Sequence, residues 1–162
     1  MAAGTDYKLK AAYIYQFTKF TDWSNHAFKS ANDPIRICVL GKNLFDKSLN
    51  SFSSRTSQKR QLKVEYLTSS KNILNCHMVF ISRSEEKKLT KVLRKIKGSP
   101  VLSVSDINGF ASQGGMIGFV AKKRKIGIEI NMEASKLAGI NISSKLLEVA
   151  TIVKNKIREN AP

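Results

Sequence analysis

The stretch VLSVSDINGFASQGGMIGFVAKKRKIGIEIN, residues 101–131, holds the patterns that decide the fold. It opens with an apolar strand at Val101–Val104, and a polar turn then leads to the tight turn Gly114–Gly115. Two apolar runs follow, Met116–Ala121 and Ile126–Ile130, separated by four basic residues. This spacing predicts a strand, a compact crossover and an antiparallel hairpin.

Further strands are predicted upstream of this stretch. Ile35–Leu40 is apolar and ends at a glycine, Leu62–Leu67 alternates as a half-buried strand does, and Met78–Ile81 is a continuous apolar run. Ser84–Lys97 has acidic residues at its start, basic residues at its end and one apolar face, which predicts a helix. The chain is therefore expected to be an α/β three-layer sandwich, with a largely parallel central sheet, a C-terminal antiparallel hairpin and helices on both faces.

Helices are also predicted near both ends of a single domain that spans residues 1–162. Residues 6–23 are expected to be amphipathic, with a buried stripe that includes Leu9, Tyr13 and Phe17. A last helix is expected from about Ser143, burying Leu146, Val149, Ala150, Val153 and Ile157. Residues 1–5 are expected to be a remnant of cloning or of a removed signal peptide.

The first helix is unusually rich in aromatic residues, which permits two interpretations. It could be a core helix, or its side chains Tyr15 and Trp23 could form part of a surface for a partner or a second subunit, because aromatic residues anchor interfaces. Downstream, Asn131 is expected to cap a helix that runs through Leu137.

The composition is that of a globular protein with a strong positive charge. The 162 residues are 42% hydrophobic and carry a net charge of +16. This charge favours anionic partners such as nucleic acid, an anionic membrane or acidic cell-wall polymers. Nucleic-acid binding is the weakest of these, because the chain contains no recognised RNA- or DNA-binding motif. No apolar run is long enough for a membrane span, and the first residues do not form a signal peptide.

The sequence contains no recognised catalytic or metal-binding motif. A glycine turn at Gly41 follows the strand that begins at Ile35, but neither a dinucleotide nor a P-loop motif is present. The two histidines, His26 and His77, have no paired ligands of the kind that zinc sites use. We therefore expect neither an enzyme, a metal site nor a cofactor.

Two features keep alternatives open. The glycines of residues 109–115 could hold an anion with backbone N–H groups or could form a strained turn that enters the hairpin. Cys38 and Cys76 could be buried thiols or a disulfide.

The chain resembles the YfiR family over nearly its whole length. The matching fragments occur in the family's order and spacing: AAYIYQFTKFTDW (11–23), IRICVLG (35–41), CHMVFIS (76–82), VLSVSDINGFASQGGMIGF (101–119), IEIN (128–131) and INISSKLLEVA (140–150). The motif at 101–119 followed by IEIN is the most specific part. One departure is Ile128, where the family usually has Phe.

The resemblance implies a regulatory protein rather than an enzyme. Members of the family are exported to the periplasm and restrain an inner-membrane diguanylate cyclase of the YfiN type by binding its periplasmic sensor region, which lowers cyclic-di-GMP and biofilm formation. Similar domains work with sensor histidine kinases, which is the alternative function. The resemblance also implies a homodimer and a disulfide between Cys38 and Cys76. The motif residues that could form a ligand-binding turn are Asp106, Gly109, Phe110, Gly114, Gly115 and Asn131.

Overall fold

A computed structural model describes residues 3–156 of the chain. The elements are α1 (Ala3–Lys19), β1 (Thr21–Asp22), η1 (Asn25–Ala27), β2 (Ile35–Leu40), η2 (Asn50–Ser54), β3 (Thr56–Ser57), β4 (Arg60–Leu67), η3 (Ser70–Asn75), β5 (Met78–Ile81), η4 (Arg83–Lys88), α2 (Leu89–Ile96), β6 (Leu102–Ser105), β7 (Ile117–Lys122), β8 (Lys125–Asn131), α3 (Met132–Leu137), β9 (Asn141–Ile142), α4 (Ser144–Leu147) and β10 (Thr151–Val153), where η denotes a 3-10 helix. Within residues 3–156, no helix is both long and apolar enough to cross a bilayer.

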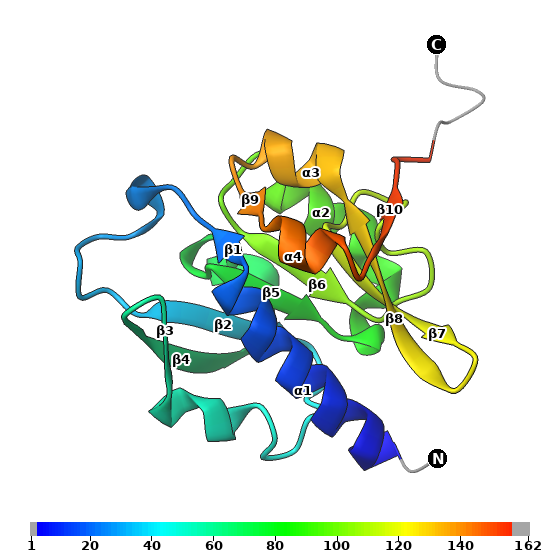
Figure 1. Ribbon diagram of the computed structural model, residues 1–162, viewed down its shortest axis with the longest axis horizontal. Helices are drawn as coiled ribbons and strands as arrows, with labels where there is room; N and C mark the ends of the chain where they lie inside the picture. The colour runs from blue at the N-terminus through cyan, green and yellow to red at the C-terminus, as the bar shows by residue number, and fades with distance from the viewer. Residues whose placement is uncertain (1–2, 157–162) are drawn as a thin grey trace.

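Eight strands form one sheet in the order β10-β8-β7-β6-β5-β2-β4-β3 (Figure 1). The pairs from β4 through β2, β5 and β6 to β7 are parallel, and β7 and β8 form an antiparallel hairpin. The predicted largely parallel sheet with an antiparallel hairpin is therefore confirmed. A separate two-stranded sheet joins β1 to β9, so the segment after α1 is tied to the segment after α3.

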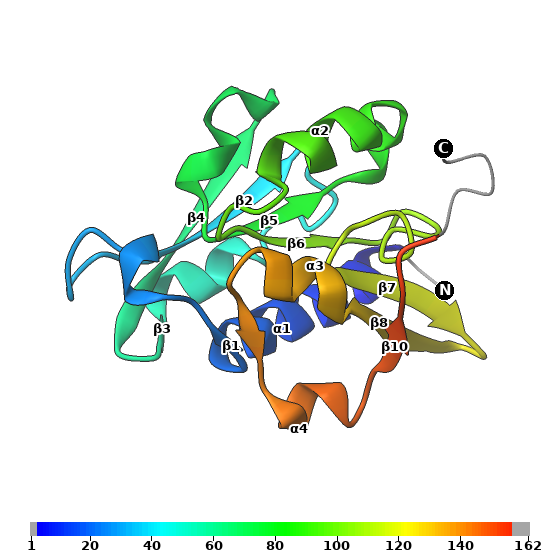
Figure 2. The ribbon, with the colours of Figure 1, turned by 90° about the horizontal axis from the view of Figure 1, so that it is seen from above.

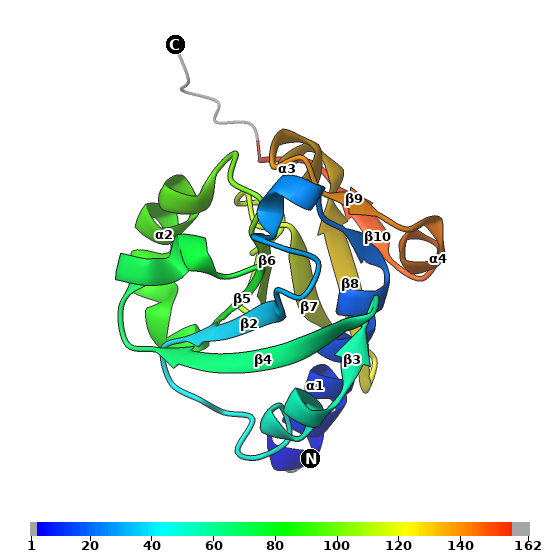
Figure 3. The same cartoon turned by 90° about the vertical axis from the view of Figure 1, so that its left-hand side faces the viewer.

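Helices cover both faces of the large sheet. Figure 3 shows α1 on one side and α2 on the other, with the sheet between them, and Figure 2 gives the same arrangement from above. The central strands β5 and β6 are buried at every position. Strands that are buried on both faces carry apolar side chains on both, so each face needs its own cover. The predicted three-layer sandwich follows from this requirement.

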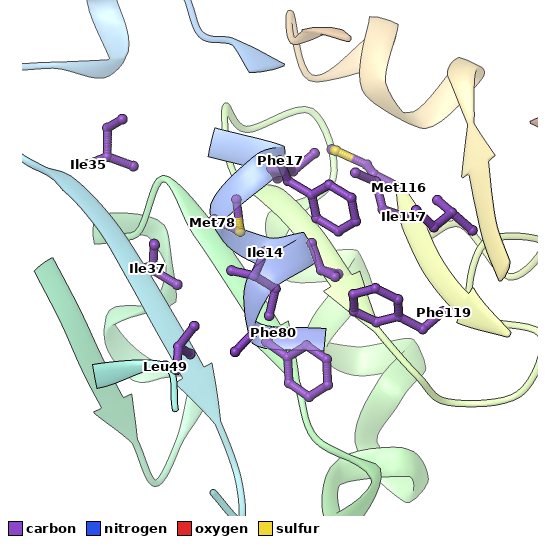
Figure 4. Close-up of a cluster of buried hydrophobic side chains, with 14 of the residues drawn as sticks. Ile14, Phe17, Ile35, Ile37, Leu49, Met78, Phe80, Met116, Ile117 and Phe119 are labelled. Atoms are coloured by element: carbon purple, nitrogen blue, oxygen red, sulfur yellow. The ribbon is translucent and has the colours of Figure 1, made fainter. Parts of the chain in front are cut away.

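The larger core lies between α1 and the sheet (Figure 4). Ile14 and Phe17 of α1 lie over side chains of the central strands, among them Phe80 of β5 and Phe119 of β7. The rings of Phe17 and Phe119 stack with centroids 5.7 Å apart. Large aromatic side chains of this kind bury much apolar area each, which makes α1 a principal part of the core.

The opposite face is smaller and contains a disulfide. Cys38 in β2 bonds to Cys76, which lies two residues before β5, and their Cα atoms are 6.0 Å apart. Both cysteines are buried in the cluster that α2 covers with Leu89, Val92 and Ile96. The pairing that the family resemblance implied is therefore present, and it links two adjacent parallel segments of the sheet.

The predicted stripe of the first helix is wrong in part. The helix ends at Lys19 rather than at residue 23, and it buries Tyr7, Ala11, Ile14 and Phe17. Leu9, which was expected in the core, is 49% exposed. Because apolar residues occupy several faces of this helix, their spacing alone does not select the face that meets the sheet.

The predicted last helix is also wrong. Only one turn forms, at Ser144–Leu147, capped by the Ser143 hydroxyl, and the chain then pairs with β8 as the parallel strand β10. Val149, expected in the core, is 69% exposed. The residues of β10, Thr151–Val153, are all β-branched, which favours a strand wherever an open sheet edge offers backbone partners. The predicted burial of Ile157 lies outside the described residues.

The disulfide should contribute strongly to stability. It closes a span of 38 residues, for which the chain-entropy model gives about 4 kcal/mol. We expect the double substitution Cys38→Ala/Cys76→Ala to lower the free energy of unfolding by about that amount, measured by urea denaturation without reductant. Dithiothreitol should destabilise the original protein and leave the double variant unchanged. Two alkylatable thiols in the untreated protein would contradict the bond.

Candidate functional site

The order of the parallel strands points to one edge of the sheet. The strands run β4-β2-β5-β6-β7, so the chain adds strands to one side of β2 first and then to the other. In open α/β sheets, ligands bind at the carboxyl ends of the strands where this reversal occurs. In this protein that place lies between the ends of β2 and β5, at Leu40 and Ile81.

Contacts within the protein occupy this place. Gly41, directly after β2, has φ +94°, and a Cβ atom on it would lie 2.6 Å from Oγ of Ser84. The N–H of Lys42 donates to the same Ser84 hydroxyl at 2.9 Å. Ser84 therefore ties η4 to the end of β2. A glycine is needed here because any side chain would collide with η4.

A buried polar cluster lies beside it, at the end of β6. Asp106 accepts hydrogen bonds at Oδ2 from the Tyr7 hydroxyl and from Nζ of Lys10, the latter at 2.9 Å. Nε of Arg83 lies 3.4 Å from the same oxygen, and Lys10 also pairs with Asp6 at 2.7 Å. The side chains of Lys10 and Asp106 are 5% and 2% exposed. This cluster joins α1 to the carboxyl edge of the sheet.

Two polar atoms at this edge have no partner in the described part of the chain. They are Oγ of Ser82 and Oδ1 of Asp106, both buried. Because Ile81 and Ser105 are register partners, Ser82 and Asp106 directly follow paired positions in the two strands. Burial, and then the hydrogen bond with Asp106, raise the pKa of Tyr7 above its ordinary value, so the phenol remains a proton donor to the carboxylate.

The rest of the predicted ligand-binding turn is packed rather than open. Phe110 is buried under α2, and a Cβ atom on Gly115 would lie 2.2 Å from its ring. The N–H groups of Gln113, Gly114 and Gly115 all donate to carbonyl oxygens within the turn. The alternative of a backbone anion cradle is therefore wrong for these three N–H groups. Gly109, with φ +72°, shapes the same turn.

Asn131 holds this turn in place. Its Oδ1 accepts from the N–H of Ala134 at 3.0 Å and so caps α3, as predicted. Its Nδ2 donates to the carbonyl of Ala111 at 2.8 Å and to Oδ1 of Asn155. One buried amide thus connects the hairpin, the glycine turn, α3 and the C-terminal segment. In addition, the backbone N–H of Lys156 donates to the carbonyl of Ser112 at 2.7 Å.

A groove of about 1040 Å³ lies next to this junction. It runs between α2, the turn at 112–114, α3 and the segment 155–156. Figure 2 shows the positions of α2 and α3 in the fold. Ser112, Gln113 and Gly114 of the glycine turn line it. Asp106 belongs to the separate cluster at the other end of the motif.

The two aromatic residues predicted to form an interface lie in different environments. Trp23 is 5% exposed and donates its ring N–H to the carbonyl of His77 at 2.9 Å, so its predicted place on an interface is wrong. Tyr15 is half-buried and stacks on Phe52 with centroids 4.9 Å apart, and Arg55 lies over both rings. An interface at Tyr15 stays a prediction.

The histidine beside the disulfide has a structural role. Nδ1 of His77 accepts the N–H of Arg36 at 3.0 Å, and Nε2 lies 2.8 Å from the carbonyl of Ala27, so the ring is held as the neutral tautomer with its proton on Nε2. Burial lowers its pKa. Within residues 3–156, no three His, Cys, Asp or Glu side chains are grouped to hold a metal ion.

The partners of Asp106 are only partly recognisable in the sequence. Lys10 lies among apolar residues on the buried side of α1, and a lysine at such a position needs a carboxylate. The spacing of Asp6 and Lys10 at i and i+4 identifies one such carboxylate. Nothing local identifies Asp106 or Arg83, which are far away in the sequence.

Loss of the Asp106 charge should destabilise the protein far more than loss of the charge on the less buried Asp6. Asp106→Asn leaves Lys10 buried with only one acidic partner, and we expect the free energy of unfolding to fall by about 3 kcal/mol in urea denaturation. Asp6 is more exposed, so Asp6→Asn should cost at most about 1 kcal/mol. Equal losses in the two variants would contradict a central role for Asp106.

Tyr7 should make stability sensitive to alkaline pH. Its pKa is raised from 10.0 in the folded protein, so the unfolded chain releases the proton first. The resulting stabilisation is complete below about pH 10 and is lost as the pH rises further. In urea denaturation between about pH 9 and 11.5, the original protein should lose more stability than Tyr7→Phe. Parallel curves would contradict the assignment, since Tyr7 is the only group that differs between the two proteins.

Comparison with known proteins identifies a family. No curated protein matches the chain at a significant level. A family model described as YfiR/HmsC-like matches residues 7–151, which include the helix that bears Tyr7 and Lys10, both cysteines, Asp106 and the whole junction around Asn131. The resemblance seen in the sequence is thereby confirmed, and the chain belongs to the YfiR/HmsC-like family.

Proposed function

We propose that this protein is a periplasmic regulator that restrains an inner-membrane diguanylate cyclase by binding the periplasmic sensor region of that enzyme. The observation that carries the proposal is the match to the YfiR/HmsC-like family over residues 7–151. Members of this family are periplasmic regulators rather than enzymes, so the activity to be explained is binding that lowers cyclic-di-GMP synthesis.

The disulfide supports the compartment. Disulfides form and persist in oxidising environments such as the bacterial periplasm and are rare in the cytosol. Cys38 and Cys76 are both buried, so the bond is part of the packed core rather than an exposed redox pair. A chain that depends on this bond would reach its full stability after export.

The carboxyl edge of the sheet supports binding rather than turnover. The place where an α/β enzyme would hold its substrate is occupied by the contacts of Gly41 with η4 and by the cluster around Asp106. The charged groups there are paired with one another across α1, η4 and β6. They serve the attachment of α1, which leaves the outer surfaces for a partner.

The test is a repression assay in cells that express a transmembrane diguanylate cyclase encoded next to this protein. Export of the chain to the periplasm should lower cyclic-di-GMP severalfold, and the purified protein should bind the purified periplasmic sensor region in calorimetry. The same chain retained in the cytoplasm should leave cyclic-di-GMP unchanged, because it cannot meet the sensor region. Unchanged cyclic-di-GMP on export, or binding to the sensor region of a neighbouring histidine kinase instead, would contradict the proposal.

A further inference from the structure

The groove lies beside the contacts that Asn131 makes with Ala111 and Asn155, and it has an apolar lining that is partly exposed. Its frame is rigid, because Asn131 and the N–H of Lys156 hold the turn at 112–114 against the C-terminal segment. Four apolar side chains line it: Leu93 and Ile96 of α2, Met116 directly before β7, and Leu137 of α3. Leu137 is 57% exposed, which is high for a large apolar side chain in a groove.

The rim of the groove is cationic. Arg94, Lys97 and Lys156 line it and are exposed, and Glu133 is the one acidic residue among its lining. Within residues 3–156, none of these three cations forms an ion pair with a carboxylate. The groove therefore has a positive rim over an apolar floor, and its charges are available to an incoming anion.

The type of occupant follows from these features. The turn N–H groups of residues 113–115 are used internally, so these groups cannot fix a small phosphate or carboxylate in the groove. Its volume is at the upper end of small-molecule sites, about 300–1000 Å³, and its rim side chains are open to solvent. Long cationic side chains around an exposed leucine suit an acidic protein segment that inserts an apolar side chain.

We propose that this groove is the docking site for the partner, and that the docked segment of the partner is acidic and carries at least one large apolar side chain. The inference rests on the proposed function, since it takes the partner to be the periplasmic sensor region of the cyclase. The net charge of +16 would steer such a segment toward the protein, and the groove would fix where it binds.

The experiment compares two double charge reversals, each made within or directly beside α2. Arg94→Glu/Lys97→Glu changes the rim of the groove, whereas Lys88→Glu/Lys95→Glu makes the same change in net charge at exposed positions outside it. Binding of the purified sensor region is measured by calorimetry at two salt concentrations, with melting temperatures as a check on folding. We expect the groove variant to weaken binding by about tenfold or more and the control by no more than about twofold. Leu137→Ala should weaken binding by about fivefold with little dependence on salt.

Three outcomes are distinguishable. Selective loss in the groove variant and in Leu137→Ala supports the docking site. Binding that is weakened equally by both charge reversals and not by Leu137→Ala overturns the docking site and leaves the proposed function intact, because steering by net charge alone then explains the result. Absence of binding by the original protein contradicts the proposed function and, with it, the identity of the partner.

Discussion

Burial of the central strands on both faces is the constraint on which the rest of the structure depends. Strands β5 and β6 have no exposed position, and β2 has only one that is partly exposed. Two separate covers are therefore required: α1 supplies one and α2 the other, with the disulfide between Cys38 and Cys76 beneath α2. The bond stabilises the smaller cover, where short elements bury less apolar surface than the aromatic face of α1 does.

The polar cluster at the carboxyl edge follows from the position of α1. A helix that crosses the sheet near the ends of the parallel strands brings Tyr7 and Lys10 to the place where other α/β proteins bind ligands. Asp106 then serves as an anchor for the helix. The carboxyl edge therefore carries the contacts that attach α1 to the sheet.

The contacts of the family motif at 101–119 show what its residues do in the fold. Asp106 fixes α1 at one end of the motif, while Phe110 and Gly115 pack so closely that only glycine fits opposite the ring. Asn131 then joins the motif to α3 and to the C-terminal segment. Within the motif, Ser112, Gln113, Gly114 and Met116 line the groove, whereas cationic residues of its rim such as Arg94 lie outside the motif.

The sequence by itself determined the features that depend on local pattern. The strands at Ile35–Leu40 and Met78–Ile81, the hairpin and the cap at Asn131 follow from runs of apolar residues, turn residues and a short polar side chain at a helix start. Family resemblance added the disulfide, which spacing alone left open.

Only the tertiary structure decided the features that depend on what each segment meets. Several faces of α1 carry apolar residues, so the sequence does not show which one is buried. The contacts with the sheet and with Asp106 bury the face that bears Tyr7 and Lys10. The tertiary structure turned Thr151–Val153 into a strand, because β8 offered an open edge. It buried Trp23 against His77 and assembled the groove from segments far apart in the chain. Such contacts join residues many positions apart, so their energies leave no periodic trace in the sequence from which they could be predicted.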